Sequence, residues 1–272
     1  MSFEFQRVAF QFLARGHLRL PAGTAVNVIR GAFGLALHET APAAEYARLF
    51  APRAACGPSG LMDRPRPFVF RVAHLRGREF RAGESFAIAV HFFDVADPGI
   101  GSFRKAFAQW ERLGLGAERA RVSLEGVEAE APRTISLDAE PAGRVAVRFV
   151  TPTELKVEGG IAQRPEFGVL FARVRDRIAT LRAMYGAGPL DIDFSAMGER
   201  AQAVRMTRCA VEWERAQRRS ARTGQVHPLG GFTGEAEYEG PLGEFLPWLR
   251  AAQFAGVGRQ TVWGKGELQV IS

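Results

Sequence analysis

The five histidines are the side chains of this sequence that titrate nearest neutral pH, so they are the first candidates for acid–base chemistry. They are His17, His38, His74, His91 and His227. His38 and Arg30 fall on one stripe of a helix predicted over residues 24–39, so a bound phosphate could meet both an imidazole and a guanidinium. The same stripe includes Gly34, which would let another group lie close to the helix. His38 also fits the helix end, where a histidine favours the negative end of the dipole, and both roles stay open.

A glycine-rich segment near the C-terminus is the second candidate for chemistry, because glycine lets a ligand approach the backbone and its amide groups. It reads Gly256-Val-Gly-Arg-Gln-Thr-Val-Trp-Gly-Lys-Gly266 and encloses two cations, Arg259 and Lys265. It is not a Walker loop or a dinucleotide fingerprint, since Gly266 follows Lys265 and too few residues remain for a helix. A phosphate-binding loop and a plain glycine-rich hairpin are both compatible with this pattern.

Positive charge is concentrated in one segment. The chain has a net charge of +7, and residues 200–222 contain seven arginines and two acids, Glu212 and Glu214. Such a segment suits a polyanion such as RNA, although a solvated arginine-rich face would have the same composition.

The elements that must position these residues repeat one plan, β-α-β-β-α-β, in each half of the chain. The first half has predicted strands at 3–13, 68–72, 86–93 and 121–127 and helices at 24–39 and 102–113. The second half has predicted strands at 144–150, 204–213, 231–239 and 268–271 and helices at 166–184 and 241–252, with 204–213 ambiguous between strand and helix. A stretch with Pro132 and Pro141 separates the halves. We therefore predict an α+β protein of two tandem ferredoxin-like (RRM-like) domains, 1–140 and 141–272.

Composition narrows the class of protein further. The 272 residues are 47% hydrophobic and 24% charged, which is typical of a folded globular chain. The two cysteines, Cys56 and Cys209, are too far apart for a Cys-x-x-Cys metal knuckle and too few for a disulfide scaffold. No signal peptide or membrane-length apolar run is visible, so we expect a cytoplasmic protein without a membrane partner. We expect no metal or other cofactor.

An ordered set of motifs in the second half resembles a known family. In sequence order the motifs are Thr151-Pro-Thr-Glu-Leu-Lys156, a long helix ending in Met184-Tyr-Gly186, Trp213-Glu-Arg215 with Arg219-Ser220 and Arg222, Leu229-Gly-Gly-Phe-Thr-Gly-Glu235, Phe245-Leu-Pro-Trp-Leu249 and the glycine-rich segment. Together they look like the C-terminal domain of the CRISPR-associated endoribonucleases that process precursor CRISPR RNA. These belong to the repeat-associated mysterious protein (RAMP) superfamily. The first half is similar mainly through Leu20-Pro and Arg30-Gly-Ala-Phe-Gly-Leu-Ala-Leu-His38.

The resemblance implies two tandem ferredoxin-like domains and metal-independent cleavage of CRISPR repeat RNA. In that reaction a 2′-hydroxyl attacks the adjacent phosphate and leaves a 2′,3′-cyclic phosphate and a 5′-hydroxyl, which calls for a base, an acid and cations. Several members place the active histidine on or just after the first helix, where His38 lies. Many also have a histidine at the head of the glycine-rich loop, where this chain has Gly256. Tyr46 and Lys265 are therefore further catalytic candidates.

For RNA binding, the candidates are the cations of the arginine-rich segment and first helix together with the glycine-rich loop. They are Arg30, Arg215, Arg218, Arg219, Arg222, His227, Gly256, Gly258, Arg259, Gly264 and Gly266. The alternative is a RAMP subunit of a CRISPR effector complex that holds repeat RNA without cutting it, which the change at Gly256 would favour. Expected partners are repeat RNA and, as further candidates, other CRISPR effector subunits. A small-molecule enzyme on the same scaffold has little support in the sequence.

Overall fold

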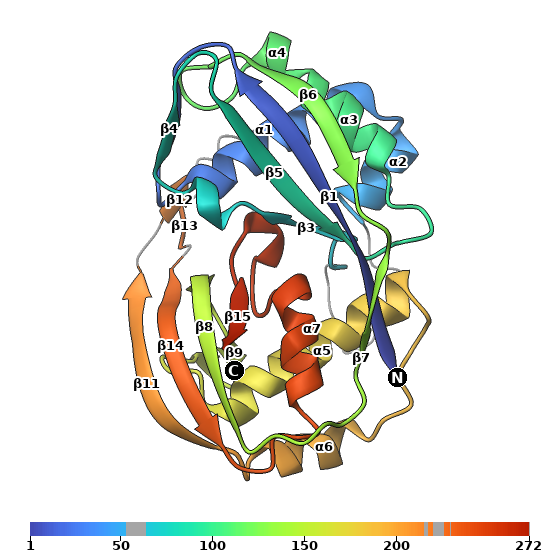
Figure 1. Cartoon of the computed structure of the whole chain (residues 1–272), viewed down its shortest axis with the longest axis vertical. Helices are drawn as coiled ribbons and strands as arrows, with labels where there is room; N and C mark the ends of the chain where they lie inside the picture. The colour runs from blue at the N-terminus through green and yellow to red at the C-terminus, as the bar shows by residue number, and fades with distance from the viewer. Residues whose placement is uncertain (53–63, 215–216, 220–225, 229, 272) are drawn as a thin grey trace. The chain divides into compact units, whose positions relative to one another are not determined.

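The computed structural model describes residues 1–52, 64–214, 217–219, 226–228 and 230–271. The chain divides into two compact units (Figure 1). The N-terminal unit is Phe5–Arg133, and the C-terminal unit is Thr134–Ser272 together with Met1–Glu4. The limit predicted between residues 140 and 141 stays a prediction about where the domains separate.

The N-terminal unit is built on an antiparallel sheet in the order β3-β5-β1-β6. If these four strands are numbered by their order in the chain, their order across the sheet is second, third, first, fourth, which is the ferredoxin-like topology. The register places Val8 opposite Val90 and Phe10 opposite Ile88, so apolar residues of neighbouring strands share one face. The strands are β1 (Ser2–Ala14), β3 (Phe68–Arg71), β5 (Ser85–Phe92) and β6 (Val122–Ala129), and β7 (Arg133–Ser136) also pairs with β1.

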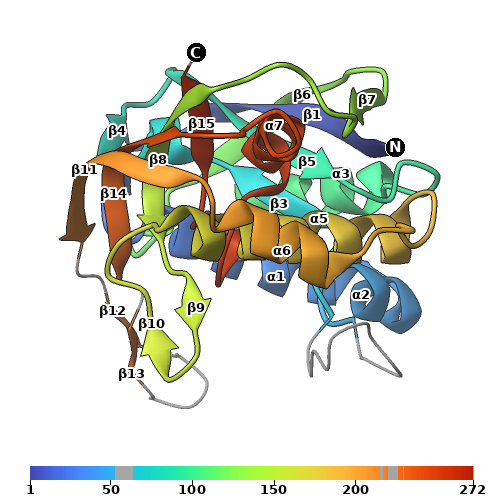
Figure 2. The ribbon, with the colours of Figure 1, turned by 90° about the horizontal axis from the view of Figure 1, so that it is seen from below.

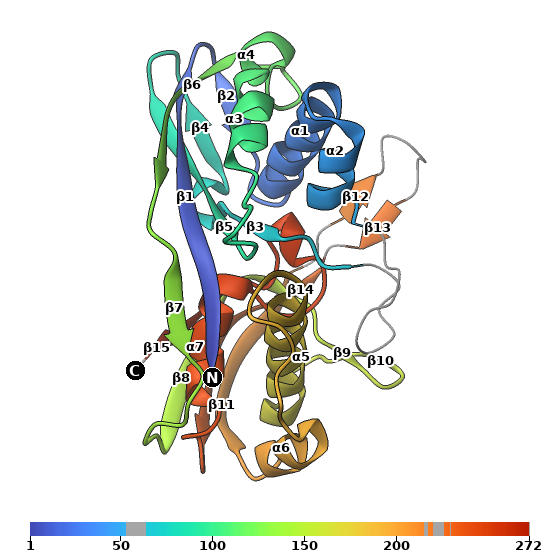
Figure 3. The same ribbon diagram turned by 90° about the vertical axis from the view of Figure 1, so that its right-hand side faces the viewer.

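Phenylalanine packing fixes the helices of this unit on one face of the sheet (Figure 3). The ring of Phe33 on the first helix lies 4.3 Å from that of Phe103, and the ring of Phe107 lies 4.7 Å from that of Phe10 in the sheet. The helix predicted over 102–113 is two helices, because the chain turns at Gln109. The helices are α1 (Ala25–Thr40), α2 (Ala43–Leu49), α3 (Ile100–Ala108) and α4 (Trp110–Leu113). The unit also has a short strand pair, β2 (Leu18–Leu20) with β4 (Arg78–Phe80), and a 3-10 turn, η2 (Ala73–Leu75).

The C-terminal unit repeats the topology, with an antiparallel sheet in the order β11-β14-β8-β15. The ambiguous segment at 204–213 is a strand, since it pairs along its length with β14. The strands are β8 (Arg144–Thr153), β11 (Arg205–Glu214), β14 (Gly231–Glu239) and β15 (Leu268–Ile271). Two hairpins add to them, β9 (Lys156–Val157) with β10 (Gly160–Ile161) and β12 (Gln217–Arg219) with β13 (Val226–Pro228). The predicted pair of ferredoxin-like βαββαβ folds is confirmed.

An aromatic cluster holds the helices of this unit. Phe171 of the long helix packs 4.6 Å from Phe245, and the buried Tyr238 donates its hydroxyl hydrogen to the Pro165 carbonyl at 2.7 Å. The helices are α5 (Phe167–Tyr185), α6 (Phe194–Ala201), α7 (Leu246–Ala255) and a 3-10 turn, η3 (Thr261–Trp263). In the part of the chain that the structure describes, no helix is long and apolar enough to cross a membrane.

Candidate functional site

His38 and Tyr46 lie together in the N-terminal unit. His38 is exposed in the last turn of α1, and Tyr46 is half-buried on α2. Their ring centroids are 5.0 Å apart and the planes are nearly perpendicular, at 89°. Neither ring nitrogen of His38 makes a hydrogen bond to the residues that the structure describes. The edge-to-face contact therefore orients the imidazole, and the described residues leave both of its nitrogens available to a ligand.

The end of α1 is completed without a hydrogen bond from His38. The Thr40 Oγ1 group donates to the Ala36 carbonyl at 2.8 Å, and the Ala41 amide donates to the Leu37 carbonyl at 2.9 Å. His38 can still favour the helix dipole by charge. Its nitrogens are nevertheless not used in capping, so the helix-end role and a chemical role are compatible.

The ring of Phe50 connects this pair to two cations. Phe50 packs against Gly34, where an added β-carbon would lie 2.5 Å from the Phe50 Cζ atom. The Tyr46 ring lies 5.5 Å from the Phe50 ring, and the guanidinium carbons of Arg30 and Arg66 lie 5.0 and 4.5 Å from its centroid. Positive charge is therefore held beside the His38–Tyr46 pair. Arg66 is absent from the sequence-based candidates because it lies in a proline-containing stretch with no periodicity to place it.

Helix α2, which holds Tyr46, is fixed by an ion-pair network around Arg48. Arg48 contacts both carboxylate oxygens of Glu45 at 3.0 Å and one oxygen of Asp94 at 3.2 Å. Its guanidinium also donates to the Asp97 carbonyl at 2.7 Å, and Ser102 donates to Glu45 at 3.1 Å. The hydrogen bond from Arg48 lowers the pKa of Glu45 below its usual value. The network ties α2 to α3 and to the loop that follows β5.

The glycine-rich loop is packed tightly within the C-terminal unit. Its four glycines all have positive φ, between 67° and 80°. The amides of Gly256, Gly264 and Gly266 donate to backbone carbonyls at 2.7, 3.0 and 3.1 Å. Added β-carbons would overlap the Glu154 carbonyl at Gly258 and the Val257 carbonyl at Gly266. The N–H groups of Gly256, Gly264 and Gly266 are therefore used within the protein, and a role of these glycines in RNA binding stays a prediction.

The backbone also explains why a glycine stands at the head of this loop, at position 256. Gly256 ends α7 with φ 75° and ψ 171°, which a residue with a β-carbon adopts only with strain. A β-carbon there would also lie 3.3 Å from both Thr261 and the Gly266 carbonyl. The head of this loop is therefore shaped for glycine.

Lys265 is buried beneath the loop, with only 5% of its surface exposed. Its Nζ group lies 2.6 Å from the Gly230 carbonyl, 3.2 Å from Gln260 Oε1 and 3.7 Å from Glu154 Oε2. Burial lowers the pKa of Lys265, and the Glu154 carboxylate opposes that change. Engaged in this way, Lys265 anchors the loop, and it belongs to a different unit from His38 and Tyr46.

Arg259 points its charge outward from the same loop. Its NH1 group lies 2.6 Å from Glu154 Oε1, and its amide donates to the Glu154 carbonyl at 3.0 Å. The side chain is still 55% exposed, whereas that of Glu154 is 6% exposed. Arg259 is therefore a fixed cation with donors left for a ligand.

The arginine-rich segment forms a hairpin where the structure describes it. Arg218 pairs in register with His227, and Arg219 pairs with Val226. Arg215 and Arg222 lie outside the described residues. The hairpin thus brings the predicted RNA-binding residues Arg218, Arg219 and His227 onto one two-stranded element.

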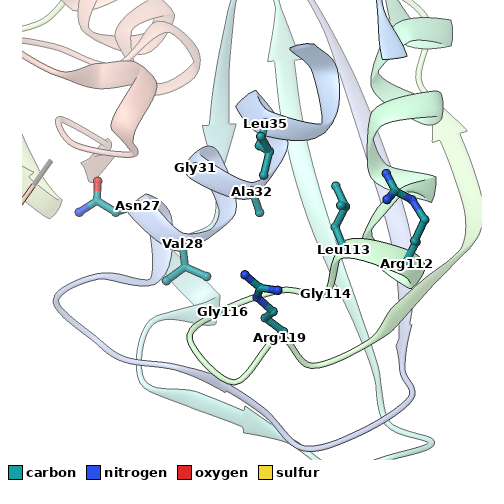
Figure 4. Close-up of a pocket in the computed structure, with 10 residues that line it drawn as sticks. All are labelled: Asn27, Val28, Gly31, Ala32, Leu35, Arg112, Leu113, Gly114, Gly116 and Arg119. Carbon is teal, nitrogen blue, oxygen red and sulfur yellow. The ribbon is translucent and has the colours of Figure 1, made fainter. Parts of the chain in front are cut away.

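A separate hollow of about 560 Å³ lies on the N-terminal unit between α1 and the loop after α4 (Figure 4). Gly31 and Leu35 of α1 line it, and Leu35 is 55% exposed. The charged residues of its lining are Arg112 and Arg119, which are both cations. In the described part of the chain, no group of three or more His, Cys, Asp or Glu could hold a metal ion.

Comparisons with known proteins agree with this architecture. A family model described as CRISPR-associated endoribonuclease Cas6 matches residues 147–268, and one described as an N-terminal domain matches residues 3–148. A Cas6 (TTHB231) product complex superposes with a TM-score of 0.65 at 18% identity, over 98% of this chain and 99% of that one. Thermus thermophilus Cas6 (TTHB231) gives a TM-score of 0.59 at 18% identity, over 100% and 99%. A chain of a Cas6-RT-Cas1–Cas2 complex gives 0.63 at 11% identity, over 98% of this chain and 29% of that one.

These identities show a shared fold, and comparison of the sequence with curated proteins gives no match. The shared fold consists of two ferredoxin-like units, and in this chain a glycine-rich loop precedes the last strand of the C-terminal unit. Residues 147–268 match the model of the CRISPR-associated endoribonuclease Cas6, so the chain is similar to Cas6 proteins over that stretch.

Proposed function

We propose that this chain cleaves CRISPR repeat RNA to mature CRISPR RNA with its own side chains and without a metal ion. The 2′-oxygen of one nucleotide forms a bond to the adjacent phosphorus, and the bond from that phosphorus to the 5′-oxygen of the next nucleotide breaks. The attacking hydroxyl gives up a proton and the leaving oxygen receives one, so the products are a 2′,3′-cyclic phosphate and a 5′-hydroxyl.

The His38–Tyr46 pair is the observation that carries this proposal. His38 moves a proton at the 2′-oxygen or the 5′-oxygen, because its ring is exposed and neither nitrogen is bonded to the described residues. Tyr46 keeps the ring in place through its edge-to-face contact. Arg30 and Arg66, both against Phe50, supply positive charge for the phosphorane.

The C-terminal unit supplies RNA binding in this proposal. Arg259 and the β12–β13 hairpin with Arg218, Arg219 and His227 contact the RNA backbone, joined by Arg215 and Arg222 of the same segment. Lys265 and the glycines hold the loop in shape rather than take part in the reaction. One matched Cas6 is a product complex and another is part of a complex with Cas1 and Cas2, so we propose repeat RNA and CRISPR proteins as partners.

Cleavage of a labelled repeat RNA in excess EDTA tests the proposal. Wild-type protein should give one cut with a cyclic phosphate end. His38→Ala should lower the single-turnover rate by about 100-fold or more while RNA affinity is kept, which is the usual size of a lost acid–base group. His17→Ala is the matched control, because His17 is an exposed histidine of the same unit that pairs with Glu79 and Glu118 instead.

Other outcomes would redirect the proposal. Tight binding without any cut by the wild type would identify a non-cleaving repeat-RNA-binding subunit. Undiminished cutting by His38→Ala would remove His38 from the mechanism, and loss of wild-type cutting in EDTA would contradict metal independence.

A further inference from the structure

A second hollow lies on the C-terminal unit, between the β9–β10 hairpin and the glycine-rich loop. It encloses about 420 Å³ and is lined by Lys156, Val157, Gly159, Gly160, Ile161 and Arg259. Both charged residues of the lining are cations. The β9–β10 hairpin extends from the same side of the unit as the arginine-rich β12–β13 hairpin (Figures 2 and 3). The hollow thus offers positive charge beside the element already proposed to bind RNA.

Lys156 and Arg259 both have hydrogen-bond donors that the described residues do not use. The exposed Lys156 makes no hydrogen bond or ion pair with the residues that the structure describes. Arg259 uses NH1 on Glu154, and its other guanidinium nitrogens are not bonded to the described residues. An added β-carbon on Gly159 or Gly160 would meet nothing within 4 Å, so a ligand can approach the hairpin backbone closely. Two convergent cations beside open backbone suit a phosphate group.

Glu154 determines where the Arg259 guanidinium lies. Its carboxylate is 6% exposed and lies 2.6 Å from Arg259 NH1, while the Glu154 carbonyl accepts the Arg259 amide at 3.0 Å. The other carboxylate oxygen lies 3.7 Å from the buried Lys265 Nζ. One acidic residue therefore fixes both the backbone and the side chain of Arg259, and the second cation keeps its charge compensated.

We propose that Lys156 and Arg259 form a subsite for one phosphodiester of the bound RNA and that Glu154 is the positioning residue of this subsite. The identity of the ligand as repeat RNA rests on the proposed function. The subsite binds RNA independently of cleavage, so it can be tested by affinity alone.

The direction in which a substitution of Glu154 changes RNA affinity distinguishes a positioning role from a purely electrostatic one. Glu154→Gln removes a negative charge beside a polyanion, which by Coulomb's law alone should tighten RNA binding. If Glu154 holds Arg259 in place, the same substitution should weaken binding several-fold. Glu158→Gln is the matched control, because Glu158 is an exposed acid in the turn of the β9–β10 hairpin. It should leave RNA binding unchanged or tighten it.

The measurement is the dissociation constant for repeat RNA at several salt concentrations. The RNA has a 2′-deoxy sugar at the mapped cleavage position, which prevents cutting during the measurement. If the wild type does not cut, unmodified RNA is used. Lys156→Ala and Arg259→Ala should each weaken binding by roughly 10-fold, and each should reduce the slope of log K against log salt by about 0.7. Lys105→Ala removes the same charge from an exposed lysine on α3 and should change neither quantity.

A double-mutant cycle guards against a purely structural effect of Glu154. In the Arg259→Ala background, Glu154→Gln should weaken RNA binding no further, whereas general damage to the fold would add to the loss.

Tighter or unchanged binding by folded Glu154→Gln would overturn the positioning role. Unchanged affinity and salt slope in Lys156→Ala would overturn the subsite, even if the RNA is still cut. A wild type that binds RNA without cutting would contradict the proposed cleavage and leave the subsite standing. Failure of the wild type to bind repeat RNA would contradict both.

Discussion

Gly34 and Gly31 lie three residues apart on α1 and have opposite surroundings. An added β-carbon at Gly34 would lie 2.5 and 2.8 Å from the Cζ and Cε1 atoms of Phe50, whereas at Gly31 it would meet nothing within 4 Å. Phe50 also contacts Tyr46 and Arg30. At the scale of single residues, the absence of a side chain at Gly34 therefore bears directly on the proposed catalytic cluster.

We expect Gly34→Ala to lower the free energy of unfolding by about 1–3 kcal/mol, because Phe50 must move out of a packed position. Cleavage should fall as well, since Tyr46 and Arg30 pack on the displaced ring. Gly31→Ala should instead raise stability by up to about 1 kcal/mol, because alanine favours a helix over glycine. Urea unfolding of both variants measures the two changes in the free energy of unfolding. Equal changes for the two substitutions would contradict the packing argument.

Helix α2 is the element that holds Tyr46 beside His38, and its attachment depends on charge. Arg48 and Glu45 are 28% and 24% exposed, so solvent screens their interaction only in part. The folded-state pKa of Glu45 is lowered by Arg48. A carboxylate with a lowered pKa contributes stability that is present above its unfolded pKa and is lost as the pH falls through the folded value.

Arg48→Met should therefore destabilise the protein by about 1 kcal/mol at pH 7, and the difference from wild type should shrink below about pH 4. Unfolding by urea at a series of pH values measures that difference. Because α2 would loosen, cleavage at pH 7 should fall more than RNA affinity. Arg104→Met, on an exposed arginine of α3, is the control and should change neither. A stability difference that is the same at pH 3 and pH 7 would show that the carboxylates are not responsible.

The main elements could be predicted from sequence because their periodicity is strong. The long helix α5 and the strand β1 differ from their predicted bounds by one residue at each end, and β14 has its predicted bounds. Helix α2 was missed because its seven residues adjoin a proline-containing stretch, and the β9–β10 hairpin because two-residue strands have no period.

At the site, helical spacing predicted the stripe of His38, Gly34 and Arg30. The contacts of the buried Lys265 and of Arg259 with Glu154 could not be predicted, since these residues are 105 or more positions from Glu154 and meet it only in the folded chain.

The outer surface of the C-terminal sheet shows why topology alone does not determine how RNA is bound. The ferredoxin-like plan is shared with proteins that stack bases on the sheet. Here Arg148 of β8 lies 2.6 Å from Glu235 of β14, and Arg144 and Arg208 both pair with Glu237. Ion pairs occupy positions that a stacking surface would need for aromatic rings. RNA contacts through the loops and hairpins fit this unit better than contacts through the sheet face.

At the scale of the whole molecule, the two proposed tasks fall on different units. His38, Tyr46 and the cations on Phe50 belong to the N-terminal unit, whereas Arg259, Lys156 and the β12–β13 hairpin belong to the C-terminal unit. Binding through phosphates depends steeply on salt, because each contact releases counterions. Proton transfer within an already bound complex has no such dependence. The net charge of +7 should therefore govern affinity rather than the rate of the chemical step.

This separation predicts distinct kinetic effects for the two sets of substitutions. In single-turnover reactions at saturating protein, Arg259→Ala and Lys156→Ala should cut at close to the wild-type rate, and raising the salt should shift only the protein concentration needed for saturation. His38→Ala should do the opposite, with a saturating rate lower by about 100-fold and an unchanged half-saturation point. The experiment is a titration of protein against trace labelled repeat RNA at two salt concentrations for each variant. A large loss of saturating rate in Arg259→Ala would mean that the C-terminal unit also takes part in the chemical step, because a residue that only binds uniformly cannot change the rate of the bound complex.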